Sequence, residues 1–201
     1  MNNPSQSTLH RAIIWVAVLN FSYFWVEFAV AQSIGSVSLF ADSIDFLEDT
    51  AINGLILFGL GLSLLYRARL GMLLAGILLI PGIATLWMAW HKFVSPVPPD
   101  AFILSLTGFG ALLVNLTCAI LLVRFRSHSG SLTRAAFLSA RNDVLANIAI
   151  IGAGLTTLAW VSAWPDLVVG LGIFLMNLDA ARDVYQAARR EHRSAMPSPR
   201  P

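Results

Sequence analysis

Charged residues and cysteine are scarce in this chain of 201 residues. Only 12% of the residues are Asp, Glu, Lys or Arg, whereas a soluble domain averages about 25%. The single cysteine, Cys118, excludes a disulfide framework and a zinc site built from several thiolates. We also find no Ser-His-Asp set, phosphate-binding loop or cofactor fingerprint. These deficits exclude a disordered chain, a nucleic-acid-binding tail and an ordinary cytosolic enzyme.

Long apolar runs are abundant, and 57% of the residues are hydrophobic. A bilayer core about 30 Å thick needs about 20 apolar residues per helix. Runs of this kind occur at six places: 12–31, 40–65, 72–93, 102–123, 135–160 and 167–181. The sequence therefore predicts an all-α integral membrane protein, a bundle of six transmembrane helices.

The six runs and their short connections use nearly the whole chain. We expect a single transmembrane domain over residues 1–201, with a tail at 1–11, the bundle at 12–181 and a second short tail at 182–201. Because Ala and Arg favour helix, the last run is expected to continue as a polar helix through 182–193.

Positive charge is distributed unevenly between the two ends of the predicted helices. If the amino terminus is cytoplasmic, the opposite side holds only Lys92, and Arg141 lies within the membrane. The cytoplasmic side then holds Arg11, Arg67, Arg69, Arg124, Arg126, Arg134, Arg182, Arg189, Arg190, Arg193 and Arg200. Since cytoplasmic loops of membrane proteins carry an excess of Lys and Arg, both termini are predicted to be cytoplasmic.

Acidic residues inside the predicted helices carry the functional argument. Each ionisable side chain in a membrane interior costs about 2.5–3.5 kcal/mol on insertion scales. The chain nevertheless places six acids and one base there: Glu27, Asp42, Asp45, Glu48, Asp49, Asp143 and Arg141. This surplus of negative charge requires compensation, by a bound cation or by protons.

Three acids of the second run share one face of a helix. At about 100° per residue, Asp42, Asp45 and Asp49 fall within a stripe about 60° wide, and Glu48 points further round. Carboxylates one turn apart repel each other, and a divalent cation relieves that repulsion. Oxygen ligands alone favour Mg, Ca or Mn, whereas an added imidazole favours Zn, Co or Fe.

The fifth run adds one carboxylate from a second helix. Ser139, Asn142, Asp143 and Asn147 share one broad polar face, and Arg141 lies on the other side. If the two helices face each other, their oxygen atoms form a cation site near the membrane midplane. The candidate metal ligands are Asp45, Asp49 and Asp143, with Asp42 as an accessory acid and Ser139 or Asn142 as weak or water-mediated ligands.

Other polar residues leave alternatives open. Asn20, Asn142 and Asn147 fit interhelical hydrogen bonding as well as a site. Glu27 is interpreted as a structural or proton-linked acid, since it is the only acid of its run. Arg141 could reach lipid headgroups, or pair with an acid such as Glu48, Glu27 or Asp143, which would undermine the metal interpretation.

Val26 and Glu27, followed by the stretch from 36 to 49, resemble the first two helices of the cation diffusion facilitator family. The stretch reads Ser-x-x-Leu-x-x-Asp-x-x-Asp-x-x-x-Asp, similar to that family's helix 2 signature, and Asp45 and Asp49 fall on its two ligand positions. On helix 5, Asp143 matches the second ligand position, and Ser139 stands where the family usually has His or Asp. The similarity runs from about residue 17 to about 191. The sequence shows no counterpart of the family's cytoplasmic carboxy-terminal domain.

This resemblance implies a homodimeric efflux transporter that exchanges a divalent metal for protons by alternating access, and not an enzyme. Its partners would be the lipid bilayer and the metal, without nucleic acid, in the inner membrane of a bacterium. No prosthetic group is expected. The transported metal would be Zn, Co, Mn or Fe. The alternative is a transport-inactive relative, a membrane scaffold or partner subunit, in which Arg141 replaces the bound cation.

Overall fold

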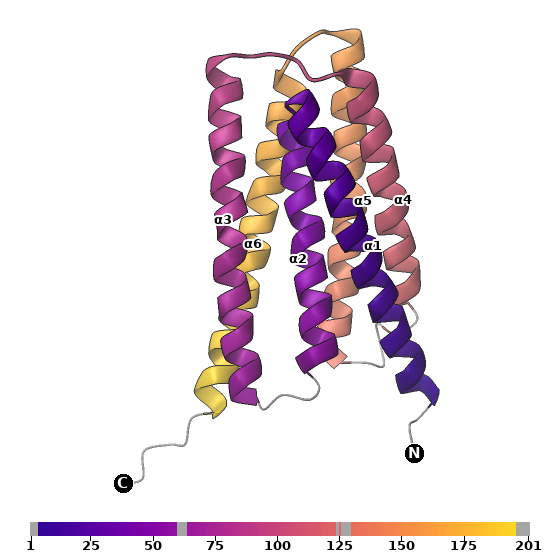
Figure 1. Ribbon diagram of the computed structural model, residues 1–201, viewed down its shortest axis with the longest axis vertical. Helices are drawn as coiled ribbons and strands as arrows, with labels where there is room; N and C mark the ends of the chain where they lie inside the picture. Colours follow the sequence, from indigo (N-terminus) through magenta and orange to yellow (C-terminus); the bar gives the residue numbers. More distant parts are fainter. Residues whose placement is uncertain (1–3, 60–63, 124, 126–129, 196–201) are drawn as a thin grey trace.

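Six helices make up the computed structural model, which describes residues 4–59, 64–123, 125 and 130–195. The helices run alternately up and down along one long axis (Figure 1). They are α1 (Pro4–Ile34), α2 (Val37–Gly59), α3 (Leu64–Val94), α4 (Ala101–Val123), α5 (Gly130–Ala159) and α6 (Trp164–Ala195). No strand occurs in these described ranges, and the all-α prediction is confirmed.

Several helix boundaries differ from the predicted runs. Helix α2 begins at Val37, three residues before the predicted start, because the Ser36 hydroxyl caps it by accepting a hydrogen bond from the Leu39 amide at 3.2 Å. Gly35, with a φ of 63°, makes the turn between α1 and α2. Helix α2 is described as far as Gly59; residues 60–63 of the predicted second run lie outside the described residues, and Leu64 and Leu65 belong to α3. Helix α6 continues to Ala195, as its predicted polar extension requires.

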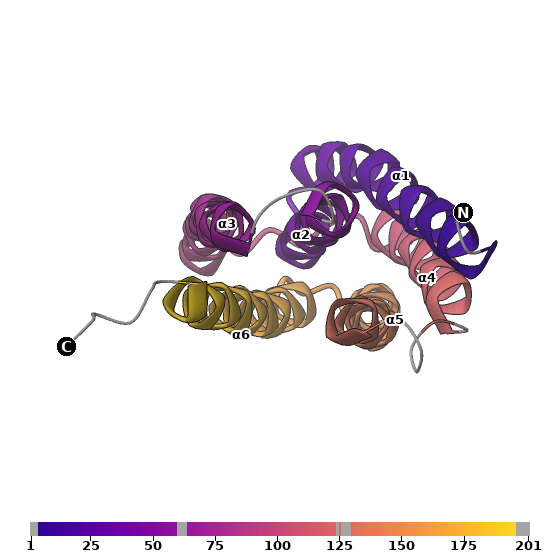
Figure 2. The same cartoon turned by 90° about the horizontal axis from the view of Figure 1, so that it is seen from below.

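Helix α2 occupies the centre of the bundle and packs against each of the other five helices. Figure 2, seen along the bundle, shows α2 beside α3 and next to α1, with α6 and α5 side by side along the other face of the bundle. Within the described parts of the chain, α3 packs on α2 and α6 alone. The acids of α2 therefore lie where side chains from several helices can meet them.

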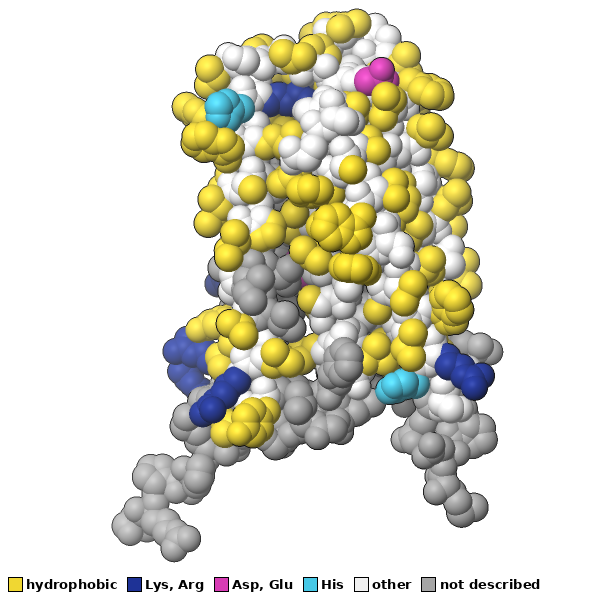
Figure 3. Space-filling model, viewed as in Figure 1, with side chains coloured by type: hydrophobic (Ala, Val, Ile, Leu, Met, Phe, Trp, Pro, Cys, Tyr) yellow, Lys and Arg dark blue, Asp and Glu magenta, His cyan; other side chains and the backbone are white. Residues whose placement is uncertain are grey.

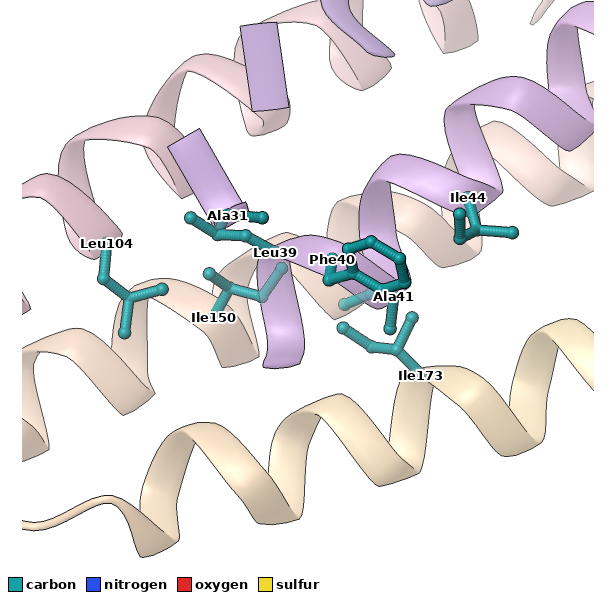
Figure 4. Packing of buried hydrophobic residues seen from close by; sticks show 9 residues of the cluster. Ala31, Leu39, Phe40, Ala41, Ile44, Leu104, Ile150 and Ile173 are labelled. Atoms are coloured by element: carbon teal, nitrogen blue, oxygen red, sulfur yellow. The ribbon is translucent and has the colours of Figure 1, made fainter. Parts of the chain in front are cut away.

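The main hydrophobic core surrounds the first half of α2. Leu39, Phe40, Ala41 and Ile44 of α2 pack against Ile173 of α6 (Figure 4). Helices α1, α4 and α5 contribute Ala31, Leu104, Ala146 and Ile150 to the same cluster. This packing fixes the rotation of α2 about its axis, and with it the direction of each acid.

The outer surface is that of a membrane protein. Large apolar side chains cover the face seen in Figure 3, and basic side chains gather mainly at one end. The start of α1 and the end of α6 lie at this end, whereas Lys92 lies near the opposite end of α3. By length and composition, Ser7–Ile34, Ala101–Val123 and Ser139–Ala159 each suffice to cross a membrane. Helix α2 does not meet that composition because it carries four acids.

Candidate functional site

The acids of α2 point in three directions. Asp42 faces α1, Asp45 and Asp49 face α5, and Glu48 lies against the α3–α6 side. The helix geometry explains the division, since Glu48 lies well away from the other three on a helical projection. The prediction that Glu48 points away from the stripe is confirmed.

Asp49 belongs to a hydrogen-bond network whose members come from four helices. Its Oδ1 accepts a hydrogen bond from the Ser139 hydroxyl of α5 at 3.0 Å, and its Oδ2 accepts one from Nδ2 of Asn20 on α1 at 3.3 Å. The Cys118 thiol of α4 in turn donates to Oδ1 of Asn20 at 3.4 Å. This network holds the carboxylate of Asp49 toward the interior of the bundle, where it is 5% exposed.

Asp45 and Asp143 form a pair between α2 and α5. Their carboxyl groups lie near enough to interact across the contact between the two helices. Asp143 is buried, and Asp45 is half-buried. Asn147, one turn after Asp143, is fully buried and uses its Nδ2 to bond the Asp143 carbonyl at 2.6 Å. The predicted juxtaposition of carboxylates from α2 and α5 is present.

Asp42 and Glu27 form another pair, between α2 and α1. Both side chains are fully buried, and their carboxyl groups face each other. None of their four oxygen atoms receives a hydrogen bond from another described group. Asp42 is thus directed toward Glu27, and it also lies within electrostatic range of Asp45 and Asp49 on its own helix.

The acids are grouped in pairs and do not form a finished coordination sphere. Among the described residues, no set of three or more His, Cys, Asp or Glu side chains is arranged to hold a metal ion. A cation bound between α2 and α5 would draw Asp49 from Ser139 and Asn20 toward Asp45 and Asp143. The donor set fits a dication, because three carboxylates and a hydroxyl supply only oxygen atoms.

Asn142 and Arg141 lie outside these groups. Both side chains are exposed, and Nη2 of Arg141 lies 3.5 Å from Oδ1 of Asn142. The inward polar face of α5 is narrower than predicted, because Asn142 is exposed at its edge while Asp143 and Asn147 point inward. No described acid pairs with the Arg141 guanidinium.

A second buried polar cluster closes the opposite end of the bundle from the termini. Lys92 of α3 lies 2.8 Å from Oδ2 of Asp166 on α6, and its ammonium also donates to the Gly35 carbonyl at 2.6 Å. Asp166 further accepts hydrogen bonds from the hydroxyls of Ser36 and Ser38, each at 2.6 Å. The cluster ties α3 and α6 to the start of α2.

Comparison with known proteins settles the family. A family model described as the cation efflux transmembrane domain matches residues 13–190. The chain belongs to the cation efflux family, also called the cation diffusion facilitators. Proteins of this family are membrane transporters and not enzymes. No curated protein matches the sequence.

Two features of the site escaped the sequence reasoning in part. Asn20, which from sequence alone fits a structural role and a site role equally well, contacts Asp49 directly. It lies seven residues before Glu27, so both side chains are on one face of α1. That spacing is the sequence signal that indicates an inward position for Asn20. Asp166 stands alone directly before the sixth predicted run, where no pattern of acids marks it. Its pairing with Lys92 joins residues 74 positions apart, which no local pattern reveals.

Proposed function

We propose that this cation efflux protein exports divalent metal cations from the cytoplasm in exchange for protons, by alternating access. The transport site lies between α2 and α5, with Asp45, Asp49 and Asp143 as ligands and Ser139 as an additional oxygen donor. The observation that carries the proposal is the direct facing of carboxyl groups from the two helices, joined by the Ser139–Asp49 hydrogen bond of 3.0 Å.

Exchange follows from the chemistry of paired acids. Two carboxylates that face each other away from water cannot both stay ionised without a cation, since each is costly to bury alone. The pair therefore holds either a proton or a metal ion. Binding of one displaces the other, as metal binding to carboxyl ligands releases their protons.

The donor set also bears on the metal. Zn and Co are the usual cargo that the family resemblance implies. In this chain Ser139 replaces the His or Asp expected on helix 5, so the site offers oxygen donors alone. Oxygen donors favour harder ions, and we therefore expect Mn or Fe to be carried at least as well as Zn or Co.

The test uses purified protein reconstituted into proteoliposomes with an acidic lumen and metal outside. Wild-type protein is expected to accumulate metal while the proton gradient lasts. Asp49→Asn and Asp143→Asn each remove one charged ligand, and we expect uptake to fall by about tenfold or more, since even indirect supports of metal sites cost about 10–100-fold. Asp179→Asn, which removes an exposed carboxylate of α6, is the matched control.

Three results decide against the proposal. Full uptake in both Asp49→Asn and Asp143→Asn would remove the site from α2 and α5. Uptake that ignores the proton gradient would remove the exchange. Loss of uptake in Asp179→Asn as well would show that the assay reports general damage, and the ligand assignment would then fail.

Assembly and location follow from the family and are proposals of the same kind. We propose a homodimer in the cytoplasmic membrane of a bacterium, held by its membrane helices. Mass measurement of the protein in lipid nanodiscs tests this directly, because a single chain per particle at every protein concentration contradicts a dimer.

A further inference from the structure

A cavity separate from the acid pairs lies between α2, α3 and α6. Its volume is about 340 Å³, which is within the range of pockets that hold small molecules. Most of its wall is apolar, with Ile44 of α2, Leu86 of α3 and Phe174 of α6 among the lining residues. It lies on the other side of α2 from Asp143, because Glu48, and not Asp45 or Asp49, faces it.

Glu48 is the one charged side chain among the described residues that line this cavity. It is 3% exposed, and its Oε1 has no hydrogen-bond partner among the described groups. An unpaired carboxylate in such surroundings is costly. The arrangement therefore points to a ligand that supplies the missing positive charge or hydrogen-bond donor.

A second polar group lies beside it. Asn177 of α6 also lines the cavity and uses its Nδ2 to bond the Ala41 carbonyl at 3.1 Å. This bond orients the amide, and its oxygen is the atom that can accept a hydrogen bond from a ligand. One carboxylate and one amide oxygen suit a donor with a single positive charge. A divalent cation needs more oxygen ligands than the described residues of this wall provide.

The position of the cavity indicates the route of the ligand. Glu48 lies eleven residues after the start of α2 at Val37, a helical rise of about 16 Å. This places it near the middle of a membrane core about 30 Å thick, beyond the reach of lipid headgroups. Ile83 and Leu86 on the rim are exposed on the outside of the bundle, where lipid chains lie. A ligand that dissolves in the bilayer can enter there.

We propose that the cavity between α2, α3 and α6 binds a lipophilic amine in its ammonium form, with Glu48 as counter-ion and Asn177 as second acceptor. The ammonium donates hydrogen bonds to the two oxygens, and the organic part fills the apolar space. This site is independent of metal transport between α2 and α5.

The test measures binding of radiolabelled 1-naphthylmethylammonium to the whole chain in phosphatidylcholine nanodiscs by equilibrium dialysis, with protein-free nanodiscs subtracted. We expect saturable binding of one amine per chain. The neutral alcohol of the same shape, 1-naphthylmethanol, and the Glu48→Gln variant should each bind about tenfold more weakly, since a hydrogen bond to a charged group is worth about 1.5–3 kcal/mol. Asp179→Asn, in an exposed acid of α6, should bind like wild type.

A second variant keeps the test decisive if Glu48→Gln proves unstable. Asn177→Leu retains the size of the side chain and removes the amide oxygen, and it should also weaken amine binding. Absence of saturable binding, equal affinity for the amine and the alcohol, or wild-type affinity in both variants would overturn the proposal. Because no metal or proton gradient is present, these outcomes are separate from success or failure of metal exchange.

Discussion

The ammonium of Lys92 lies 2.8 Å from the carboxylate of Asp166, and both side chains are almost completely buried. Asp166 also accepts backbone hydrogen bonds from Val37 at 2.9 Å and Ser38 at 3.1 Å, the first residues of α2. A carboxylate of α6 thus caps the start of α2 while it neutralises a cation of α3. The three helices are fixed to one another at this end of the bundle.

Lys92→Met is expected to destabilise the protein by about 3 kcal/mol. Breaking a buried ion pair by removing one partner costs about 3–5 kcal/mol, and the lower end applies because Asp166 keeps its hydrogen bonds to α2. The measurement is unfolding in mixed micelles of increasing SDS content. Arg69→Met removes an exposed cation from the same helix and should change stability by less than about 0.5 kcal/mol. Equal effects of the two changes would contradict a special role for the pair.

The close contact of α6 with α2, next to the Lys92–Asp166 pair, leads to a second prediction. A Cβ added at Gly170 would lie 2.7 Å from the Ser38 amide nitrogen and from the Val37 carbonyl carbon, whereas one at Gly172 would meet nothing within 4 Å. Gly170→Ala should therefore force the helices apart and cost about 1–3 kcal/mol. Gly172→Ala should leave stability unchanged or stabilise the protein by up to about 1 kcal/mol, since Ala has a higher helix propensity than Gly. The same SDS titration measures both, and a Gly170→Ala protein as stable as Gly172→Ala would refute the contact.

The facing acids Glu27 and Asp42 lead to a third prediction. In Glu27→Gln the new amide can donate a hydrogen bond to Asp42, so stability should be retained. In Glu27→Leu the Asp42 carboxyl loses the acid of α1 that faces it, and stability should fall by about 1–3 kcal/mol. Gln32→Leu, at an exposed position of α1, controls for adding a leucine to this helix. If Glu27→Leu were as stable as Glu27→Gln, the two acids would not depend on each other.

The sequence predicts the helices and the clustering of acids, but it does not predict which partner each acid faces. Apolar run length defines six helices because each must span the same membrane thickness. The helical projection correctly separates Glu48 from Asp49, since that depends only on 100° per residue. It cannot show that Asp42 faces Glu27, because this depends on how α1 and α2 pack, nor that Asn142 lies at the exposed edge of α5.

Arg141 provides the fourth prediction, which separates a transporter from an inactive scaffold. Its side chain is exposed and lies next to Asn142, so Arg141→Ala should leave metal binding and proton-driven uptake within about twofold of wild type, as for surface changes away from a site. If Arg141 instead served as a built-in counter-ion, its removal would create metal binding that the wild type lacks. Calorimetric titration with Mn²⁺ or Zn²⁺ distinguishes the two, and a gain of binding in Arg141→Ala would favour the scaffold.

Ser139→His tests how the donor atoms select the metal. The Ser139 hydroxyl already contacts Oδ1 of Asp49 at 3.0 Å, so an imidazole at this position adds a nitrogen ligand beside the carboxylates. Nitrogen donors favour Zn over Mn, and we expect the ratio of Zn to Mn transport to rise by about tenfold, the size of effect that a change in metal-site support produces. Ser139→Ala removes the hydroxyl without adding a ligand and should lower transport of both metals without raising that ratio. Competition between the two metals in proteoliposomes measures it. An unchanged ratio in Ser139→His would place residue 139 outside the coordination sphere, and transport would then depend on carboxylates alone.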